Sequence, residues 1–538
     1  MNQNVKISIK EKIGYALGDG AANIAWRGVS TFLFIFYTDV FGIDPVSVGL
    51  LMLVARSSDG ISDVLMGVIG DRSNSKYGKF RPWILWTAVP LALILSLLFT
   101  APELGEQGKI VYAYITYILF TLIYTANNIP YGALMAVMTG DDKERTSLGS
   151  YRMVGAFAGG MLVQGALLYL VVFFGNVNPK IDVAEIPNSS NYEITVSAPL
   201  HVESARIKLD EGLGKFEWAD ATIDDKEASA TKSFQMEANK EYRLVVSNFE
   251  NLTSENITII NQKQGYSKSM YLLSVFLAIF MIITFLTTRE RVLPPKNQET
   301  DIKKDLKQLF KNRPWAVLLV IGLLFNVYTA IKQGIVVIYF AHYLHNELLA
   351  ASFMVALTLA SIGGAMLVAP LSKKWGKKKL FIYALLFSAA VNCLFVFCGP
   401  QDTAAIFTIG IISEAASAMF PTLLFVMLGD AADFSEWKNG RRATGLIYSA
   451  GSLATKFGGG IAGAIIGFVL SSFNYNGQDA AAIEGAIPGM IMLMSWIPAI
   501  IAFGAAGIML FYPLSKTKMD EITQDLNNKR ANELSQTN

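Results

Sequence analysis

Long apolar runs dominate this chain of 538 residues and restrict it to a narrow group of folds. A run of about 20 apolar residues is long enough to cross the hydrocarbon core of a bilayer as a helix. Hydrophobic residues make up 52% of the chain and charged residues 16%, whereas an average soluble chain is about 25% charged. The sequence therefore predicts an all-α, polytopic membrane protein and not a soluble enzyme.

Twelve such runs form two sets of six. The first set of predicted spans is 12–38, 46–70, 82–101, 109–139, 147–175 and 268–288. The second set is 314–341, 347–371, 379–398, 403–430, 443–472 and 487–514. The first run is longer than the apolar region of a secretory signal and contains Asp19 and Arg27, so it is predicted to be a span and not a cleaved leader.

An internal repeat supports this division. Tyr77-Gly78 follows the second span and Trp375-Gly376 follows the eighth, and basic residues flank both pairs. Any cytoplasmic loop is expected to be basic, which is the alternative explanation. Together with the helix count, the repeat favours two related bundles that face each other across a site at the membrane midplane.

Lys and Arg residues gather in loops on one side of the predicted spans, and such loops are typically cytoplasmic. They lie in residues 72–81, 289–313, 373–379 and 438–442. Both termini are expected on the same side. The predicted organisation is 1–175 for helices one to five, 176–267 for an insertion, 268–288 for helix six, 289–313 for a cytoplasmic loop, 314–514 for the C-terminal bundle and 515–538 for a cytoplasmic tail.

The insertion at 176–267 is polar and breaks the pattern of apolar runs. Apolar and polar residues alternate over 192–197, 202–209, 242–246 and 257–259, as in short strands. Roughly 90 residues with several short strands are typical of a small β-sandwich. We therefore expect a β-sandwich-like domain outside the cell or in the periplasm, with an extracellular protein or a glycan as its candidate partner.

Composition excludes several other classes of protein. The net charge is +2 and no long basic block stands apart from the membrane-flanking loops, so nucleic-acid binding is not expected. Cys393 and Cys398 lie in one apolar run, which excludes a disulfide framework and a cysteine metal site. His201, His342 and His345 all lie outside the hydrophobic cores. Cation or proton chemistry within the membrane must then depend on carboxylates.

The second span carries three ionisable residues, Arg56, Asp59 and Asp63. A charge in a spanning helix costs several kcal/mol unless it is paired or faces water, so each is a functional candidate. Asp59 and Asp63 share one helix face because they are four residues apart. Two such carboxylates predict a site for a small cation or a shared proton. The alternative is a structural ion pair between Arg56 and Asp59, which leaves Asp63 unexplained.

Two further polar stripes suit a sugar, which needs donors, acceptors and an aromatic face. One comprises Asp19, Asn23 and Arg27 in the first span, and Tyr124, Thr125 and Asn128 belong to the other in the fourth span. Helix packing is the alternative role for the Asn residues. The remaining polar residues in the spans are Arg152, Lys332, Gln333, Glu414 and Lys456.

Several motifs in register make the chain recognisable. They are Gly18–Asn23, Tyr37–Val40, Arg56–Asp63, Tyr77–Trp83, Tyr124-Thr125 with Ile129-Pro130, Asp430–Arg442 and Thr455-Lys456-Phe457. The chain resembles the glycoside-pentoside-hexuronide:cation symporters of the major facilitator superfamily, a family that includes the melibiose permease. The resemblance implies a twelve-helix major facilitator fold in a bacterial inner membrane. It also implies inward glycoside transport with Na⁺, Li⁺ or H⁺ by alternating access, without any cofactor besides this coupling ion.

The same resemblance assigns roles to individual residues. Asp59 and Asp63 match the cation carboxylates, which are metal ligands if the ion is Na⁺, with Ser62 and Thr125 as neighbouring ligands. The positions that match sugar-site and coupling residues are Asn23, Tyr124, Asn128, Arg152 and Lys456. The melibiose permease has acidic residues where this chain has Asn23 and Asn128, so the sugar specificity stays open. The family as a rule also lacks the insertion.

Arg27 and Lys332 lie at corresponding depths of the first and seventh spans. Both could face an anionic substrate, since a guanidinium grips a carboxylate in two places. Ion pairs of Arg27 with Asp19 and of Lys332 with Glu414 are the alternative. The leading hypothesis is therefore cation-coupled symport of a glycoside or oligosaccharide, with a uronide among the candidates. A surface-glycan sensor or scaffold and a lipid or drug carrier on the same fold are the competing hypotheses.

Overall fold

The computed structural model describes residues 6–73, 75–139, 142–187, 191–209, 215–218, 227–228, 234–247, 252–291, 312–439, 444–522 and 524–526. Most of the predicted loop 289–313 and the end of the predicted tail 515–538 lie outside these residues. The chain forms two compact units. Unit 1 comprises Met1–Pro294, Gln333–Val355 and Gly463–Met490, and unit 2 comprises Pro295–Lys332, Ala356–Ala462 and Ile491–Asn538.

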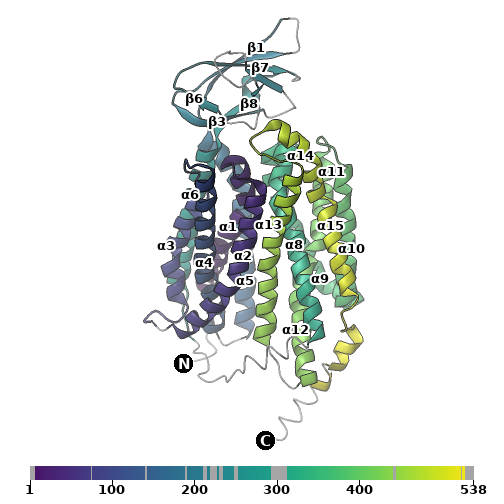
Figure 1. The fold of residues 1–538 in the computed structure, drawn as a ribbon. Helices are drawn as coiled ribbons and strands as arrows, with labels where there is room; N and C mark the ends of the chain where they lie inside the picture. Colours follow the sequence, from purple (N-terminus) through teal and green to yellow (C-terminus); the bar gives the residue numbers. More distant parts are fainter. Residues whose placement is uncertain are drawn as a thin grey trace. The chain divides into compact units, whose positions relative to one another are not determined.

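Each predicted span of the first set overlaps one helix of the structure (Figure 1). These helices are α1 (Ile9–Ile35), α2 (Pro45–Arg72), α3 (Arg81–Leu98), α4 (Glu106–Met138), α5 (Asp142–Gly175) and α6 (Gln262–Thr287). A π-helical turn, Phe36–Val40, continues α1. The start of α2 follows from its sequence, because Asp44 accepts a hydrogen bond from the Ser47 N–H at 2.9 Å and Pro45 occupies the first helical turn.

The second set of predicted spans also coincides with helices. They are α8 (Arg313–His342), α9 (Glu347–Trp375), α10 (Lys377–Cys393), α11 (Thr403–Ser417), α12 (Met419–Asn439), α13 (Thr444–Ser472), α14 (Ala480–Met494) and α15 (Trp496–Met509). Among the described residues, nine helical stretches are long and apolar enough to cross a membrane. The chain is thus a mostly helical, multi-pass membrane protein.

Two predicted spans, 403–430 and 487–514, are each divided into two helices, which the sequence prediction missed. The breaks fall at Ala418 and Ser495, and a proline follows each by three residues. Proline has no N–H for the carbonyl four residues earlier. For Pro498 that carbonyl belongs to Met494, and it accepts a hydrogen bond from Asn392 Nδ2 at 2.9 Å instead. The second break is therefore stabilised by a side chain from α10.

Close backbone contact joins α1 to α5 in unit 1. Gly155 and Gly159 on α5 lie against the carbonyl groups of Ala16 and Gly20 on α1, and a Cβ atom at either glycine would overlap them. Small residues at the contact allow helices in a membrane to approach in this way. The two helices therefore form a tightly packed pair.

Both glycines of the predicted repeat have backbone angles in the left-handed region. The φ angle is 111° at Gly78 and 76° at Gly376, where side chains other than hydrogen are disfavoured. After Gly78, the Glu290 carboxylate accepts hydrogen bonds from the N–H groups of Lys79, Phe80 and Arg81 at 2.7 to 2.9 Å. The shared feature of the two loops is thus a tight turn that only glycine adopts easily.

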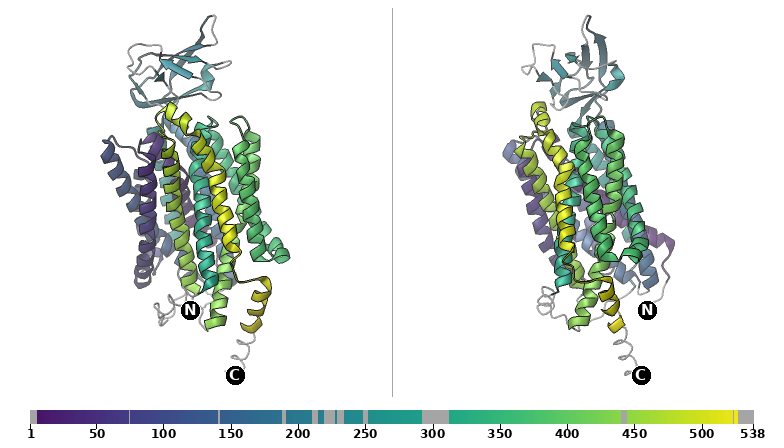
Figure 2. Two further views of the ribbon diagram at one scale, coloured as in Figure 1. Left: turned by 45° about the vertical axis from the view of Figure 1, so that its right-hand side comes forward. Right: turned by 90° about the vertical axis from the view of Figure 1, so that its right-hand side faces the viewer.

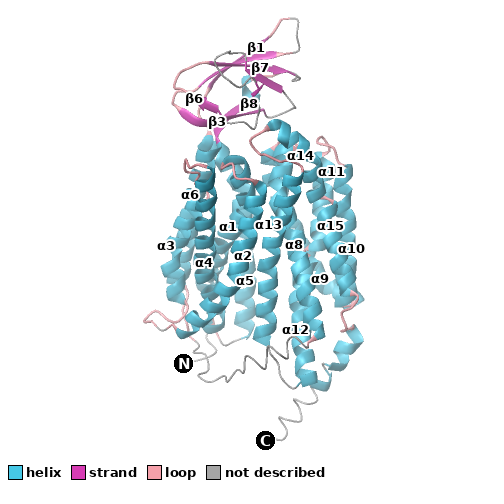
Figure 3. Ribbon diagram, viewed as in Figure 1, coloured by secondary structure: helices cyan, strands magenta, loops and turns pink. Residues whose placement is uncertain are grey.

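Among the residues that the structure describes between α5 and α6, eight strands form two sheets (Figure 3). One sheet has the order β1-β2-β7-β4-β5 and the other β6-β3-β8. Their bounds are β1 Lys180–Glu185, β2 Tyr192–Ser197, β3 Val202–Leu209, β4 Lys215–Trp218, β5 Glu227–Ala228, β6 Phe234–Met236, β7 Tyr242–Ser247 and β8 Ile257–Asn261. The four predicted strands are present, and β2 and β3 have the predicted bounds.

Both sheets contribute to one apolar cluster. Ile194 and Val196 from β2 are fully buried in it, together with Ile207 from β3 and Ile259 from β8. Along β2, buried residues alternate with half-buried ones, as the alternating sequence predicts. The strands remain one group beyond the ends of the unit 1 helices in two further views (Figure 2). This segment therefore has a core of its own.

Candidate functional site

The two carboxylates predicted on α2 converge on a hydroxyl group of α4. Thr125 Oγ1 lies 3.0 Å from Asp63 Oδ1 and 3.4 Å from Asp59 Oδ1. Asp59 is 1% exposed, whereas Asp63 is half-buried. The Thr125 hydroxyl has a single hydrogen and donates to only one carboxylate at a time. Three oxygen atoms from two helices therefore come together at one point.

Arg56 contacts the other side of this group. Its Nη1 lies 3.4 Å from Asp59 Oδ2, so the ion pair considered from the sequence is present. It uses the Asp59 oxygen that does not face Thr125, and the two interactions coexist. The Ser62 hydroxyl donates to the Asp59 carbonyl at 2.9 Å.

Asp19 on α1 forms an ion pair with Arg152 on α5. Arg152 Nε lies 3.3 Å from Asp19 Oδ2, and 32% of the arginine side chain is exposed. The Arg152 guanidinium also lies 5.5 Å from the centre of the Tyr131 ring. Asn23 Nδ2 donates to the Asp19 carbonyl at 2.9 Å. The structure thus brings three of the predicted substrate residues, Asp19, Asn23 and Arg152, to one region of α1 and α5.

Aromatic rings connect α1 with α4. The centres of the Trp26 and Tyr124 rings are 5.6 Å apart, and the Arg56 guanidinium lies 4.0 Å from the centre of the Trp26 ring. Trp26 therefore contacts both Tyr124 of α4 and Arg56, the ion-pair partner of Asp59.

The other polar residues of α1 and α4 have different environments. Asn127 is buried and donates from Nδ2 to Thr87 Oγ1 at 2.7 Å, as expected of a packing residue. Asn128 and Arg27 are half-buried. Lys456 lies in α13, but its side chain is outside the part of the chain that the structure describes.

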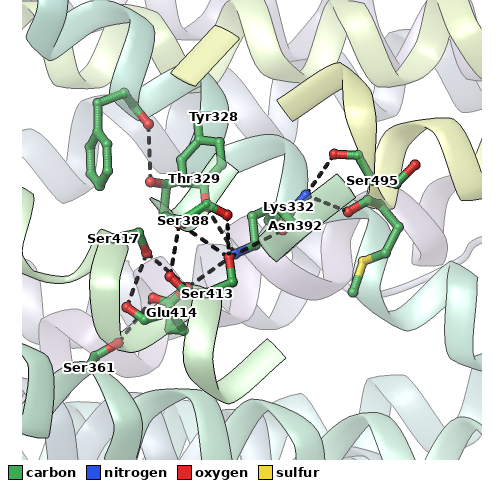
Figure 4. Close-up of polar contacts among 12 residues, drawn as sticks. Tyr328, Thr329, Lys332, Ser361, Ser388, Asn392, Ser413, Glu414, Ser417 and Ser495 are labelled. Carbon is green, nitrogen blue, oxygen red and sulfur yellow. Dashed lines mark hydrogen bonds and ion pairs between the residues drawn. The ribbon is translucent and has the colours of Figure 1, made fainter. Parts of the chain in front are cut away.

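Lys332 in unit 2 is engaged in a buried polar network (Figure 4). Its ammonium group lies 3.4 Å from Glu414 Oε2, so the alternative ion pair considered from the sequence is present. It also donates to Tyr328 Oη at 3.3 Å and to Ser413 Oγ at 3.4 Å. An ammonium group has three hydrogens. Three acceptors of the same unit therefore surround the Lys332 ammonium.

The family model described as MFS/sugar transport protein matches residues 14–202 and 225–516. The chain belongs to the MFS/sugar transport protein family. The match leaves out residues 203–224, which lie in the β-stranded segment. Membership makes the chain a sugar transporter of the major facilitator superfamily, embedded in the membrane, and not an enzyme.

Curated relatives of this MFS/sugar transport protein align over nearly their whole length. The inner membrane symporter YicJ of Escherichia coli is 29% identical, with 96% of this chain and 95% of the relative covered. The isoprimeverose transporter of Lactiplantibacillus pentosus is 28% identical, with 97% and 92% covered. The glucuronide carrier protein homolog of Escherichia coli is 25% identical, with 98% and 97% covered.

Solved structures of more distant transporters share the fold. The nucleoside transporter NupG aligns with a TM-score of 0.60 at 12% identity, covering 94% of this chain and 100% of the other. A bacterial homologue of the human lysosomal transporter Spinster aligns with a TM-score of 0.61 at 12% identity, covering 94% and 98%. At this identity the likeness concerns the fold alone.

Proposed function

We propose that the chain is a cation-coupled symporter that carries a glycoside or oligosaccharide by alternating access. The coupling ion is Na⁺ or H⁺. The observation that carries this proposal is the convergence of Asp59 and Asp63 on Thr125. Of the competing hypotheses, a glycan sensor and a lipid or drug carrier are both disfavoured by membership of a sugar-transport family.

The chemistry of the three oxygens supports a cation site. When the Thr125 hydroxyl donates to one carboxylate, its oxygen faces the other with lone pairs only. Lone pairs of the hydroxyl oxygen and of that carboxylate repel each other. A small hard cation among the three oxygens, or a proton on one carboxyl group, removes this repulsion. The same ligands serve Na⁺ or H⁺, so both are candidates for the coupling ion.

The substrate site is proposed next to the cation site. Donors and acceptors from Asn23, Asn128 and the Asp19–Arg152 pair suit sugar hydroxyls, and Tyr124 supplies an aromatic face. Two of the relatives are named for isoprimeverose and for glucuronides, which supports a glycoside.

A uronide is a weaker candidate than a neutral glycoside. An anionic substrate would need Arg27 and Lys332 as its cations, and the ammonium of Lys332 contacts Glu414, Tyr328 and Ser413. Arg27 remains as the candidate cation for a carboxylate. A neutral glycoside that competes for uptake at least as well as the matching uronide would settle the point against the uronide.

For the topology, we infer a bacterial inner membrane, with both termini in the cytoplasm. The basic loops support this orientation. Residues 176–267 then form an extracellular or periplasmic β-sandwich-like domain, consistent with two sheets around a shared core. The proposed bundles are 1–175 with 268–288, and 314–514. An external protein or a glycan is the proposed partner of the inserted segment.

Uptake into proteoliposomes tests the proposed function. We expect labelled glycoside to accumulate only with an inward Na⁺ or H⁺ gradient. Asp59→Asn and Asp63→Asn should abolish accumulation but keep sugar exchange, whereas Asp182→Asn, on an exposed position of β1, should behave as wild type. Thr125→Val should weaken cation affinity by about tenfold, the loss of one hydrogen bond to a charged group, and Thr125→Ser should restore it. Full accumulation in both Asp variants would refute the assignment.

A further inference from the structure

A second buried cluster surrounds Asp39, in the π-helical turn that continues α1. Asp39 is 3% exposed. Its Oδ1 accepts hydrogen bonds from Thr38 Oγ1 at 2.6 Å and from Tyr475 Oη at 2.7 Å. Its Oδ2 lies 2.7 Å from His342 Nε2. The carboxylate of Asp39 therefore joins the end of α1 to the end of α8 and to the loop that follows α13.

Neighbouring residues of the same segments also pack closely together. Gly477, in the same loop as Tyr475, packs against the Asp39 side chain. Along the adjoining helices, Gly463 on α13 contacts Met52 on α2, and Gly467 contacts the carbonyl of Pro45. The segments concerned are Gln333–Val355 and Gly463–Met490, which belong to unit 1 together with the first six helices.

An arginine of the β-stranded segment enters this cluster. Arg206 lies on β3, is 5% exposed, and donates from Nη2 to the carbonyl of Asp39. Burial lowers the pKa of Arg206, and the nearby carboxylates of Asp39 and Glu347 act in the opposite direction. Glu347, at the start of α9, in turn accepts a hydrogen bond from Tyr266 of α6 at 3.3 Å.

The position of Arg206 is favourable only while the cluster is assembled. A buried guanidinium is costly unless opposite charges and acceptors surround it. Those partners come from α1 and α9, so separating the helix ends would leave the charge without them. Burial also raises the pKa of Tyr475, so its hydroxyl stays protonated and continues to donate to Asp39.

We propose that the inserted strands are part of the transporter's gate, with Arg206 as the residue that stabilises its closed form. Arg206 is a positioning residue, because it acts through Asp39 and not on a substrate. Its contact must break when this end of the protein opens, which rests on the alternating access proposed above. Arg206 lies at a position that the family model does not match, so this contact is a feature of the chain's own insertion.

Accessibility of a buried cysteine tests the proposal without any substrate or ion gradient. The reporter is Met52→Cys, a buried position of α2 next to Gly463, in a background with Cys393→Ala and Cys398→Ala. Intact cells are treated with a membrane-impermeant maleimide. The variants compared are Arg206→Gln, Arg206→Lys and the matched control Arg243→Gln, which removes an exposed arginine from β7.

We expect Arg206→Gln to raise the labelling rate about tenfold, the effect of losing one hydrogen bond made by a charged group. Arg206→Lys should raise it less, and Arg243→Gln should leave it unchanged. Unchanged labelling in Arg206→Gln, or an equal rise in Arg243→Gln, would overturn the proposal. If Arg206→Gln does not reach the membrane, Tyr475→Phe replaces it, and we expect the same rise in labelling rate. Unchanged labelling in both Tyr475→Phe and Arg206→Lys would then overturn the proposal.

A separate reporter distinguishes failure of the gate from failure of the proposed topology. Lys240→Cys places a thiol at a half-exposed side chain of the β-stranded segment and should be labelled from outside. If it is labelled only in inverted vesicles, the topology is wrong, and the comparison of Arg206 variants is made in those vesicles. Absent glycoside uptake would count against the symporter alone, because the labelling result does not depend on uptake.

Discussion

The guanidinium of Arg56 lies 4.0 Å from the centre of the Trp26 ring, and the same arginine forms an ion pair with Asp59. A cation over an indole face contributes about 2 kcal/mol when the contact is desolvated. This contact links the carboxylates of α2 to the aromatic residues of α1 and α4. In the proposed symporter, cation binding near Asp59 would alter the position of Trp26, and with it the proposed sugar site.

We expect Trp26→Leu to uncouple the two sites. The cation should still bind, but its effect on sugar affinity should fall by about thirtyfold, because the desolvated cation–π contact is lost. Trp26→Phe should retain most of the coupling. Titration calorimetry of sugar binding with and without Na⁺ measures the effect, and Trp86→Leu, at an exposed position of α3, is the control. Coupling that survives in Trp26→Leu would argue against this link.

Breaking the Lys332–Glu414 pair should destabilise unit 2. Lys332→Met leaves the Glu414 carboxylate uncompensated, and losing one partner of a buried pair costs about 3 to 5 kcal/mol. The double variant Lys332→Met with Glu414→Gln should recover much of the loss. Thermal unfolding in detergent measures it. As a comparison, Lys518→Met breaks the exposed pair with Glu521 and should cost less than about 1 kcal/mol. Equal melting temperatures for all variants would contradict the structural role.

Gly78→Ala should strain the loop between α2 and α3. The left-handed backbone costs about 1 to 2 kcal/mol for a residue with a Cβ atom, and the new methyl group would also contact the Glu290 carboxylate. We expect a lower melting temperature than for Gly105→Ala, because Gly105 has open space around it and a negative φ. A larger loss in Gly105→Ala would show that the turn does not constrain Gly78.

The segment 176–267 should fold when it is expressed alone. Its two sheets share a buried core, and a core of its own is what an independent domain requires. Circular dichroism of the soluble fragment should show β structure and a cooperative thermal transition. A helical or disordered spectrum would exclude an autonomous β domain.

The helices could be predicted because a spanning helix is marked by a local property, a long apolar run. The breaks at Ala418 and Ser495 could not. Pro130 lies inside the continuous helix α4, whereas Pro498 accompanies a break that Asn392 stabilises from another helix. Whether a proline ends a helix therefore depends on a tertiary partner that the local sequence does not reveal.

The candidate sites divide in the same way. The spacing of Asp59 and Asp63 places them on one face, so their proximity followed from the sequence. The cluster around Asp39 unites residues 39, 206, 342 and 475, which share no local pattern. The sequence places His342 outside the hydrophobic runs. In the structure it is the last residue of α8, and only the fold brings Asp39 to it.

The glycine contacts between α1 and α5 have a consequence for motion. No side chain separates the two backbones at Gly155 and Gly159, so moving these helices apart would lose their close packing contact. The pair is expected to travel as one rigid body, carrying Asp19 and Arg152 at a fixed separation from the loaded to the empty carrier. The far end of α1 is held to other segments by polar contacts, which water can replace. In the proposed transport cycle, a sugar would therefore meet the same charge pair from either side of the membrane. The polar contacts at the far end of α1 would break and re-form in each cycle.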